Sequence, residues 1–263
     1  MAFQNILVET RERVGLITLN RPKVLNALNA LMLRELDELF ATLADDDAIR
    51  VILLRGAGGK AFAAGADISE LAEVDGSSGE QFAERTHRIF RRVETLGKPV
   101  IAVIDGFALG GGCELAMACN LRLASPAARL GQPEIKLGLI PGYGGTQRLP
   151  RLVGRGAALK MLLTGAIIDA AEALRIGLVD ELVTGDAETG LMPRARELAA
   201  QISAMPPLAV SAAIEAVDRG SDLTLDEALA LEATIFGRLC ATEDKREGTR
   251  AFLEKRPAKW SGR

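Results

Sequence analysis

The chain has 263 residues, of which 48% are hydrophobic and 25% charged, so it can bury a substantial globular core. Its formal net charge of −3 argues against a nucleic-acid-binding surface, and we expect no nucleic-acid partner. Charged residues interrupt the N-terminal segment, and no stretch approaches the roughly 18 apolar residues of a membrane span. We expect a cytoplasmic protein without membrane contact; the alternative is the mature form of an organellar matrix protein.

The first two-thirds of the chain are predicted to alternate strands with helices. Residues 6–10 and 14–19 form a paired start, and apolar residues at helical spacing (Met32, Leu36, Leu39, Phe40 and Leu43) predict the first helix. The short runs at 51–54, 99–104, 121–124 and 129–131 are typical of buried parallel strands. Segments 56–65 and 106–112 are interpreted as glycine-rich loops that lead into helices. This rhythm predicts a layered α/β core.

Residues 67–97 are predicted to be mostly helical, with a flexible break at 75–79. From Thr146 onward the chain is predicted to be almost wholly helical. Pro206 and Pro207 suit a helix start that would place Val210, Ile214 and Val217 inward. The spacing of Thr224 and Glu227 is that of a capping box. The basic residues 255–260 are expected to be exposed.

Two glutamates, Glu114 and Glu134, are the strongest candidates for chemistry. Glu114 closes a triple-glycine run in the first turn of a predicted helix, and Glu134 lies in a turn after the next strand. Two carboxylates across one pocket, beside free backbone N–H groups, suit acid–base chemistry on a polarised carbonyl. For each residue a structural interpretation stays open, since a helix dipole favours a carboxylate at Glu114 and an acidic loop residue is usually solvated.

Two further loops could border the same pocket, at 63–68 and 141–145. Asp67 in the first loop is also expected to cap a helix. The only histidine, His87, lies in a charged helix and is interpreted as solvated. Cys113 is interpreted as a packing residue, and the three cysteines have no metal-ligand spacing, so we expect no metal.

The order and spacing of five segments resemble the crotonase, or enoyl-CoA hydratase, superfamily over nearly the whole chain. These segments are 19–29, 61–68, 101–114, 131–138 and 141–149. The resemblance implies a crotonase-like spiral of ββα repeats in residues 1–195 that holds the active site. It also implies a C-terminal α-helical oligomerisation region in residues 196–263 that builds homotrimers, often paired into hexamers.

The same resemblance implies an acyl-CoA thioester substrate whose carbonyl oxygen lies between the N–H groups of Ala66 and Gly111. Such oxyanion-hole donors contribute about 10²–10³ each to rate in comparable sites. Glu114 would activate the water that attacks C3, and Glu134 would exchange the proton at C2 of a trans-2-enoyl-CoA. No cofactor is expected, because coenzyme A is part of the substrate and the thioester itself stabilises the carbanion.

Further substrate contacts are implied by motif position for Ala64, Asp67, Ile68, Ser69, Gly110 and Tyr143. For Tyr143, contact with the acyl group and simple packing both stay open. Ser69 departs from the family, which often has a lysine there that meets a CoA phosphate. Arg21, Lys23, Lys60 or the basic C-terminus could replace that lysine.

Other activities stay as alternatives. The same scaffold could support an enoyl-CoA isomerase, a thioester hydrolase, or a hydratase/lyase acting on a branched or aromatic acyl-CoA. A catalytically inactive scaffold or an RNA-binding protein is the alternative of another class. Acidic net charge and the retention of both glutamates argue against it, since unpaired buried carboxylates are costly.

Overall fold

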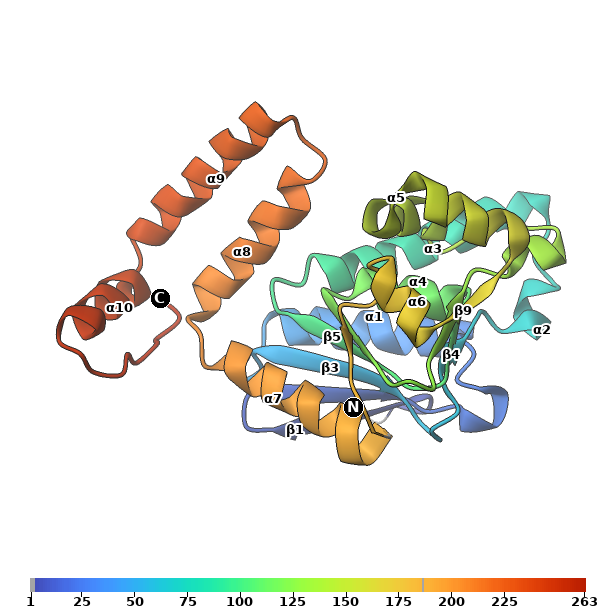
Figure 1. Ribbon diagram of the computed structural model, residues 1–263, viewed down its shortest axis with the longest axis horizontal. Coiled ribbons are helices and arrows are strands. Elements are labelled where there is room, and N and C mark those ends of the chain that lie inside the picture. The colour runs from blue at the N-terminus through green and yellow to red at the C-terminus, as the bar shows by residue number, and fades with distance from the viewer. Residues whose placement is uncertain (1–2, 186) are drawn as a thin grey trace.

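The computed structural model describes residues 3–185 and 187–263 and is shown in Figure 1. A mixed α/β body holds two sheets and most of the helices. Three helices, coloured orange to red, project away from this body (Figure 1). They are α8 (Pro207–Gly220), α9 (Leu225–Cys240) and α10 (Glu243–Leu253).

The larger sheet has six strands in the order β1-β2-β3-β5-β7-β10. Their bounds are β1 (Ile6–Arg11), β2 (Val14–Leu19), β3 (Val51–Gly56), β5 (Val100–Ile104), β7 (Leu121–Ala124) and β10 (Glu181–Leu182). The smaller sheet has four strands in the order β4-β6-β8-β9. Their bounds are β4 (Ala61–Ala64), β6 (Phe107–Leu109), β8 (Arg129–Gly131) and β9 (Ile167–Asp169).

The helices of the body are distributed along the whole chain. They are α1 (Ala30–Ala44), α2 (Ile68–Leu71), α3 (Gly76–Glu94), α4 (Gly111–Ala118), α5 (Gly145–Thr164), α6 (Ala170–Arg175) and α7 (Met192–Ser203). Shorter turns are η1 (Pro22–Val24), η2 (Glu134–Leu137) and η3 (Ala187–Leu191).

The predicted start of the fold is confirmed. β1 and β2 pair antiparallel, with Ile6 opposite Leu19. The side chain of Asn29 caps α1 by accepting a hydrogen bond from the Met32 N–H at 2.9 Å. All five apolar residues predicted to share one face of α1 are buried. Each such side chain contributes about 1.5–3 kcal/mol when fully buried, which is ample to hold the helix on the sheet.

The chain repeats a strand–strand–helix unit, and this repeat positions the functional loops. The first strand of each unit (β3, β5, β7) joins the large sheet, and the second (β4, β6, β8) joins the small one. All neighbours within these two sets are parallel. The predicted spiral of ββα repeats is therefore confirmed. Because the carboxyl ends of parallel strands lie at one edge, the loops after β4, β6 and β8 come together.

Several sequence predictions need correction. The loops expected at 56–65 and 106–112 contain β4 and β6, and the region expected to be almost wholly helical also contains the short strands β9 and β10. These strands are two to four residues long. They are too short to show a period, and in β4 alanines replace the usual β-branched residues.

The flexible break predicted at 75–79 is also wrong, because these residues begin α3. Asp75 caps this helix by accepting from the Ser77 and Ser78 N–H groups, each at 2.9 Å. The Ser78 hydroxyl in turn accepts from the Asp75 N–H at 3.0 Å, which completes a capping box. Glycine and serine at these positions are thus part of a helix start rather than a break.

The C-terminal helices expose apolar side chains that the sequence pattern alone assigns to a core. Val217 was expected to face inward but is 66% exposed, which corrects that prediction. Other exposed side chains of this region are Leu225, Leu229, Phe236, Phe252 and Leu253. The predicted capping box at Thr224 and Glu227 is confirmed. We define these six exposed residues as the α8–α10 apolar face.

The predicted division at residue 195 falls inside α7, which packs on the large sheet through Ala195 and Ala199. The division into a core and a trimerisation region stays a prediction. Among the described residues no single helix is long and apolar enough to span a membrane, although 187–203 and 207–220, bent by 105°, meet these criteria as a pair.

Candidate active site

Three loops meet at the carboxyl ends of β4, β6 and β8. They carry Ala66, the glycines at 110–112 and Glu134. Gly110 shows how closely they approach, because a Cβ atom added there would lie 2.8 Å from Glu134 Oε1. Its φ of +50° is also in the region that favours glycine. Both the space and the backbone conformation therefore require glycine at this position.

Two backbone N–H groups border the same space. At the end of β4, Gly65 accepts from the Leu28 N–H and Asp67 donates to the Leu28 carbonyl, which leaves the Ala66 N–H between them. Gly111 begins α4, where an N–H has no partner within the helix. Within residues 3–185 and 187–263 neither amide donates a hydrogen bond. A Cβ atom on Gly111 would lie 3.4 Å from the Ala66 nitrogen, so both donors can reach one oxygen.

Glu114 projects from the first turn of α4 and is 1% exposed. Its Oε1 accepts from the Tyr143 N–H at 2.8 Å and the Gly145 N–H at 2.6 Å. Burial raises the pKa of this carboxyl to about 8, and the nearby charge of Glu134 adds to the rise. The group is therefore poised to exchange a proton near neutral pH.

Glu134 is the first residue of η2, directly after the stiff Gln132–Pro133 turn. Burial raises the pKa of its carboxyl to about 7. With its amide oriented toward this carboxyl, Gln132 donates from Nε2 to Oε1 at 3.0 Å and Oε2 at 3.1 Å. Gln132 is fully buried, so it holds Glu134 in a fixed orientation.

The turn at 141–145 is held from behind by an ion pair that sequence reasoning missed. Arg148 donates from Nη1 to the Tyr143 carbonyl at 2.8 Å and also pairs with Glu94 of α3. Since the same turn supplies both N–H donors to Glu114, Arg148 indirectly fixes that carboxylate. The signal was available, because both Gln132 and Arg148 lie inside the segments that carry the family resemblance.

Of the remaining residues predicted to contact substrate, some are bonded within the protein and others are exposed to solvent. Asp67 caps α2, as expected, and forms an ion pair with Arg21 at 2.9 Å. The Ser69 hydroxyl donates to Asp67 at 2.6 Å, and Ile68 is 57% exposed. Ala64 is half-buried, and its N–H donates to the Leu25 carbonyl. Asp67 therefore shapes the loop that presents Ala66, and its carboxylate is occupied.

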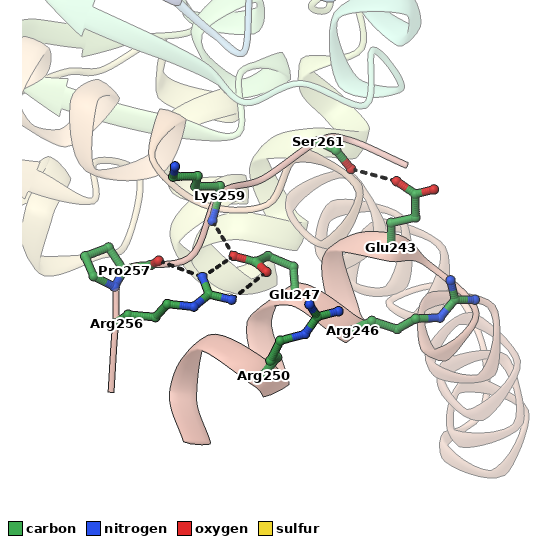
Figure 2. Close-up of a pocket in the computed structure, with 8 residues that line it drawn as sticks. All are labelled: Glu243, Arg246, Glu247, Arg250, Arg256, Pro257, Lys259 and Ser261. Atoms are coloured by element: carbon green, nitrogen blue, oxygen red, sulfur yellow. Dashed lines mark hydrogen bonds and ion pairs between the residues drawn. The ribbon is translucent and has the colours of Figure 1, made fainter. Parts of the chain in front are cut away.

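The basic residues predicted to contact a CoA phosphate differ in whether their charge is already paired. The Arg21 guanidinium is engaged, since it also donates to the Ala27 carbonyl at 2.6 Å. Lys23 and Lys60 are exposed beside the loops. The basic C-terminus instead borders a cavity of about 820 Å³ against α10, shown in Figure 2. There Arg256 forms ion pairs with Glu247 and Glu254, and the helix α10 that carries Glu247 belongs to the extension that projects from the body (Figure 1).

Two other predictions for single residues agree with the structure. His87 is exposed on α3, as a solvated residue should be. Cys113 is fully buried, and burial raises the pKa of its thiol to about 12, so it packs rather than reacts. Among the described residues no group of three or more His, Cys, Asp or Glu side chains could hold a metal ion.

The chain is similar to known proteins along nearly its whole length. A sequence model described as enoyl-CoA hydratase/isomerase matches residues 9–263. A short-chain-enoyl-CoA hydratase of Clostridium acetobutylicum is 47% identical, with 97% of each chain covered. A crotonyl-CoA hydratase of Syntrophomonas wolfei is 44% identical, with 98% of each covered. The crystal structure of an enoyl-CoA hydratase from Bacillus anthracis superposes with a TM-score of 0.94 at 39% identity, covering 99% of this chain and 100% of that one.

Proposed function

The chain belongs to the enoyl-CoA hydratase/isomerase family and is an enoyl-CoA hydratase. We propose that it adds water across the double bond of short trans-2-enoyl-CoA thioesters. The product is a 3-hydroxyacyl-CoA. The names of the two relatives above support the restriction to short chains. The reaction makes it a hydro-lyase, consistent with a role in acyl-CoA metabolism.

One observation supports the mechanism most directly: the buried Glu114 carboxyl and the half-buried Glu134 carboxyl, both with raised pKa values, lie beside two N–H groups that donate no hydrogen bond within the described residues. The thioester oxygen would accept from the Ala66 and Gly111 N–H groups, which stabilises the enolate as negative charge develops on that oxygen. The dipole of α4, which begins at Gly111, adds to this stabilisation.

The carboxyls then divide the proton transfers. Ionised Glu114 takes a proton from water as the water oxygen bonds to C3, and electrons of the double bond move toward the thioester. Protonated Glu134 donates its proton to C2 on the same face. The sum is one water added, and the pair regains its starting state when the proton on Glu114 replaces the one lost by Glu134. This division requires Glu114 charged while Glu134 keeps its proton. Since the pKa of Glu114 is raised to about 8 and that of Glu134 to about 7, this is the minor of the two singly protonated forms of the free protein, in equilibrium with the major one.

No cofactor takes part in this proposal, because the thioester alone stabilises the carbanion equivalent at C2. Coenzyme A belongs to the substrate, and Lys23, Lys60 and Lys136 are exposed cations near the binding loops in sequence. The cytoplasmic location stays a prediction.

The oligomeric state is a further part of the proposal. The α8–α10 apolar face consists of six large apolar side chains exposed on the three helices that project from the body, and extensive exposed apolar surface is typical of an interaction site. We infer that copies of this chain cover the face in a homotrimer or a hexamer. Sedimentation equilibrium of the purified protein tests this assembly, and a monomer at micromolar concentration would contradict it.

The activity is tested by the loss of conjugated-thioester absorbance when the protein is mixed with crotonyl-CoA. Glu114→Gln and Glu134→Gln should each lower the rate by about 10²–10⁴, the usual range for a general acid or base. The exposed Glu38→Gln variant is the matched control and should retain full activity. If wild-type protein binds crotonyl-CoA but leaves the absorbance unchanged, hydration is excluded and isomerisation of a 3-enoyl-CoA becomes the next assay.

A further inference from the structure

The side chain of Tyr143 borders the oxyanion site directly. Its ring atoms Cδ2 and Cε2 both lie 2.8 Å from the position of a Cβ atom added to Gly111. The backbone N–H of Tyr143 meanwhile holds Glu114 at 2.8 Å. One residue thus contributes a ring beside one free amide and a donor to the carboxylate that acts at C3.

Two phenylalanines of α3 hold this ring in place. The Phe82 ring centroid lies 5.6 Å from that of Tyr143 with the planes tilted by 40°, and the Phe90 centroid lies 5.8 Å away, edge to face. Tyr143 is only 3% exposed. We define Tyr143, Phe82 and Phe90 as the aromatic cap.

The Tyr143 hydroxyl does not determine where the ring lies. It is buried without a hydrogen-bond partner among the described residues. The Thr86 hydroxyl donates to the Phe82 carbonyl at 3.3 Å and also lies close enough to the Tyr143 hydroxyl to interact with it. Packing against the two phenylalanine rings is the main contact of this side chain, and a phenylalanine should occupy the same position.

A second cavity of about 420 Å³ lies along α3 and shares Phe82 with the cap. Val74, Ser78, Gln81, Phe82 and Arg85 contribute to its lining. Phe82 lines this cavity and packs against the Tyr143 ring, which borders Gly111, so aromatic rings connect the wall of the cavity to the catalytic loops.

We propose that Tyr143 determines acyl chain length, because the aromatic cap blocks the way from C3 toward the cavity along α3. This inference rests on the proposed hydration reaction. With the thioester oxygen at the two amides and C3 facing Glu114, the carbons after C3 run toward the residue whose N–H holds Glu114. That residue is Tyr143, and its ring stops a chain that extends much beyond a crotonyl group.

The test compares crotonyl-CoA with trans-2-octenoyl-CoA, which has four more methylenes. Wild-type protein should favour crotonyl-CoA. In Tyr143→Ala the ratio of kcat/KM for octenoyl-CoA to that for crotonyl-CoA should rise about fourfold per methylene accommodated, on the order of 10² in all. Tyr143→Phe, the matched control, should keep the wild-type ratio because the ring remains.

Phe82→Ala provides a second route if Tyr143→Ala does not fold. Phe82 is only half-buried, and its removal should raise the same ratio. Equal kcat/KM values for both substrates in the wild-type protein would refute the proposal that Tyr143 limits chain length. An unchanged ratio of kcat/KM values in the folded alanine variants would refute it as well.

Binding separates this proposal from the hydration reaction. Butyryl-CoA and octanoyl-CoA cannot be hydrated, so their dissociation constants report how the aromatic cap affects binding of a short and a long acyl chain, independently of the reaction. Preference for butyryl-CoA in wild-type protein, with tighter octanoyl-CoA binding in Tyr143→Ala, supports the cap even if crotonyl-CoA is not hydrated. Equal affinities in both proteins refute the cap even if crotonyl-CoA is hydrated.

Discussion

Replacing Glu114 with glutamine should stabilise the protein at alkaline pH while it removes catalysis. Burial raises the pKa of Glu114 from its ordinary value of 4.5 to about 8, so the folded state holds a proton that the unfolded state releases. Wild-type stability must therefore fall as pH rises from 4.5 to 8, by about 1.4 kcal/mol per pH unit. Between pH 5 and pH 9 the loss due to this residue amounts to about 4 kcal/mol.

The glutamine variant avoids this loss because its side chain stays neutral. Its Oε1 can still accept from the Tyr143 and Gly145 N–H groups, so the packing is preserved. For a chain of this size, about 4 kcal/mol corresponds to a difference in Tm on the order of 10 °C. The variant and the wild-type protein should thus differ little at pH 5, and the variant should melt well above the wild-type protein at pH 9.

The assay is thermal unfolding of both proteins at pH 5, 7 and 9 at one protein concentration, since assembly couples Tm to concentration. Glu38→Gln, on the exposed face of α1, should keep a constant Tm difference from wild type at every pH. A Tm difference between Glu114→Gln and wild type that does not change from pH 5 to pH 9 would refute the assignment of a buried, high-pKa carboxyl.

Three further predictions concern catalysis. The pH profile of kcat/KM should be bell-shaped, because one carboxyl of the Glu114–Glu134 pair must be charged and the other protonated. The rate should rise through an apparent pKa near 7 and fall through one near 8. A plateau from pH 6 to pH 9 would contradict this prediction. Gln132→Leu should move the acidic limb to higher pH by about one unit, because losing two donors to the Glu134 carboxylate raises the lower apparent pKa of the coupled pair. An unmoved limb with reduced kcat would mean that Gln132 acts only through packing. Gly111→Ala should lower kcat by about 10²–10³ while the protein still folds, because its methyl group would displace the Tyr143 ring and crowd one amide donor; unchanged kcat would show that this N–H does not contact the thioester.

Several features of the fold are legible in the sequence because they depend on local patterns. The apolar period of α1 and the pairing of β1 with β2 are examples, since each reports burial within a few turns of chain. The triple glycine at 110–112 likewise marks a place where backbone approaches a ligand or a neighbouring chain. The resemblance of five segments then identifies Glu114 and Glu134 as the pair to test.

Other features depend on contacts that no local pattern records. β4 and β6 are too short to show a period, yet their parallel pairing brings Ala66 beside Gly111 from 45 positions away. Val217 has a core-like pattern and lies in solvent, because α8 projects away from the body.

The sequence by itself determined which residue types could perform the chemistry, and the tertiary structure decided their state. Glu114 is an acidic residue in a helix turn by sequence, and only burial at 1% exposure raises its pKa toward neutrality. Gln132 and Arg148 acquire roles only through the groups they meet, the Glu134 carboxyl and the Tyr143 carbonyl. Solvation and hydrogen bonding at a site are set by residues distant in the chain, so they exist only once the chain is packed.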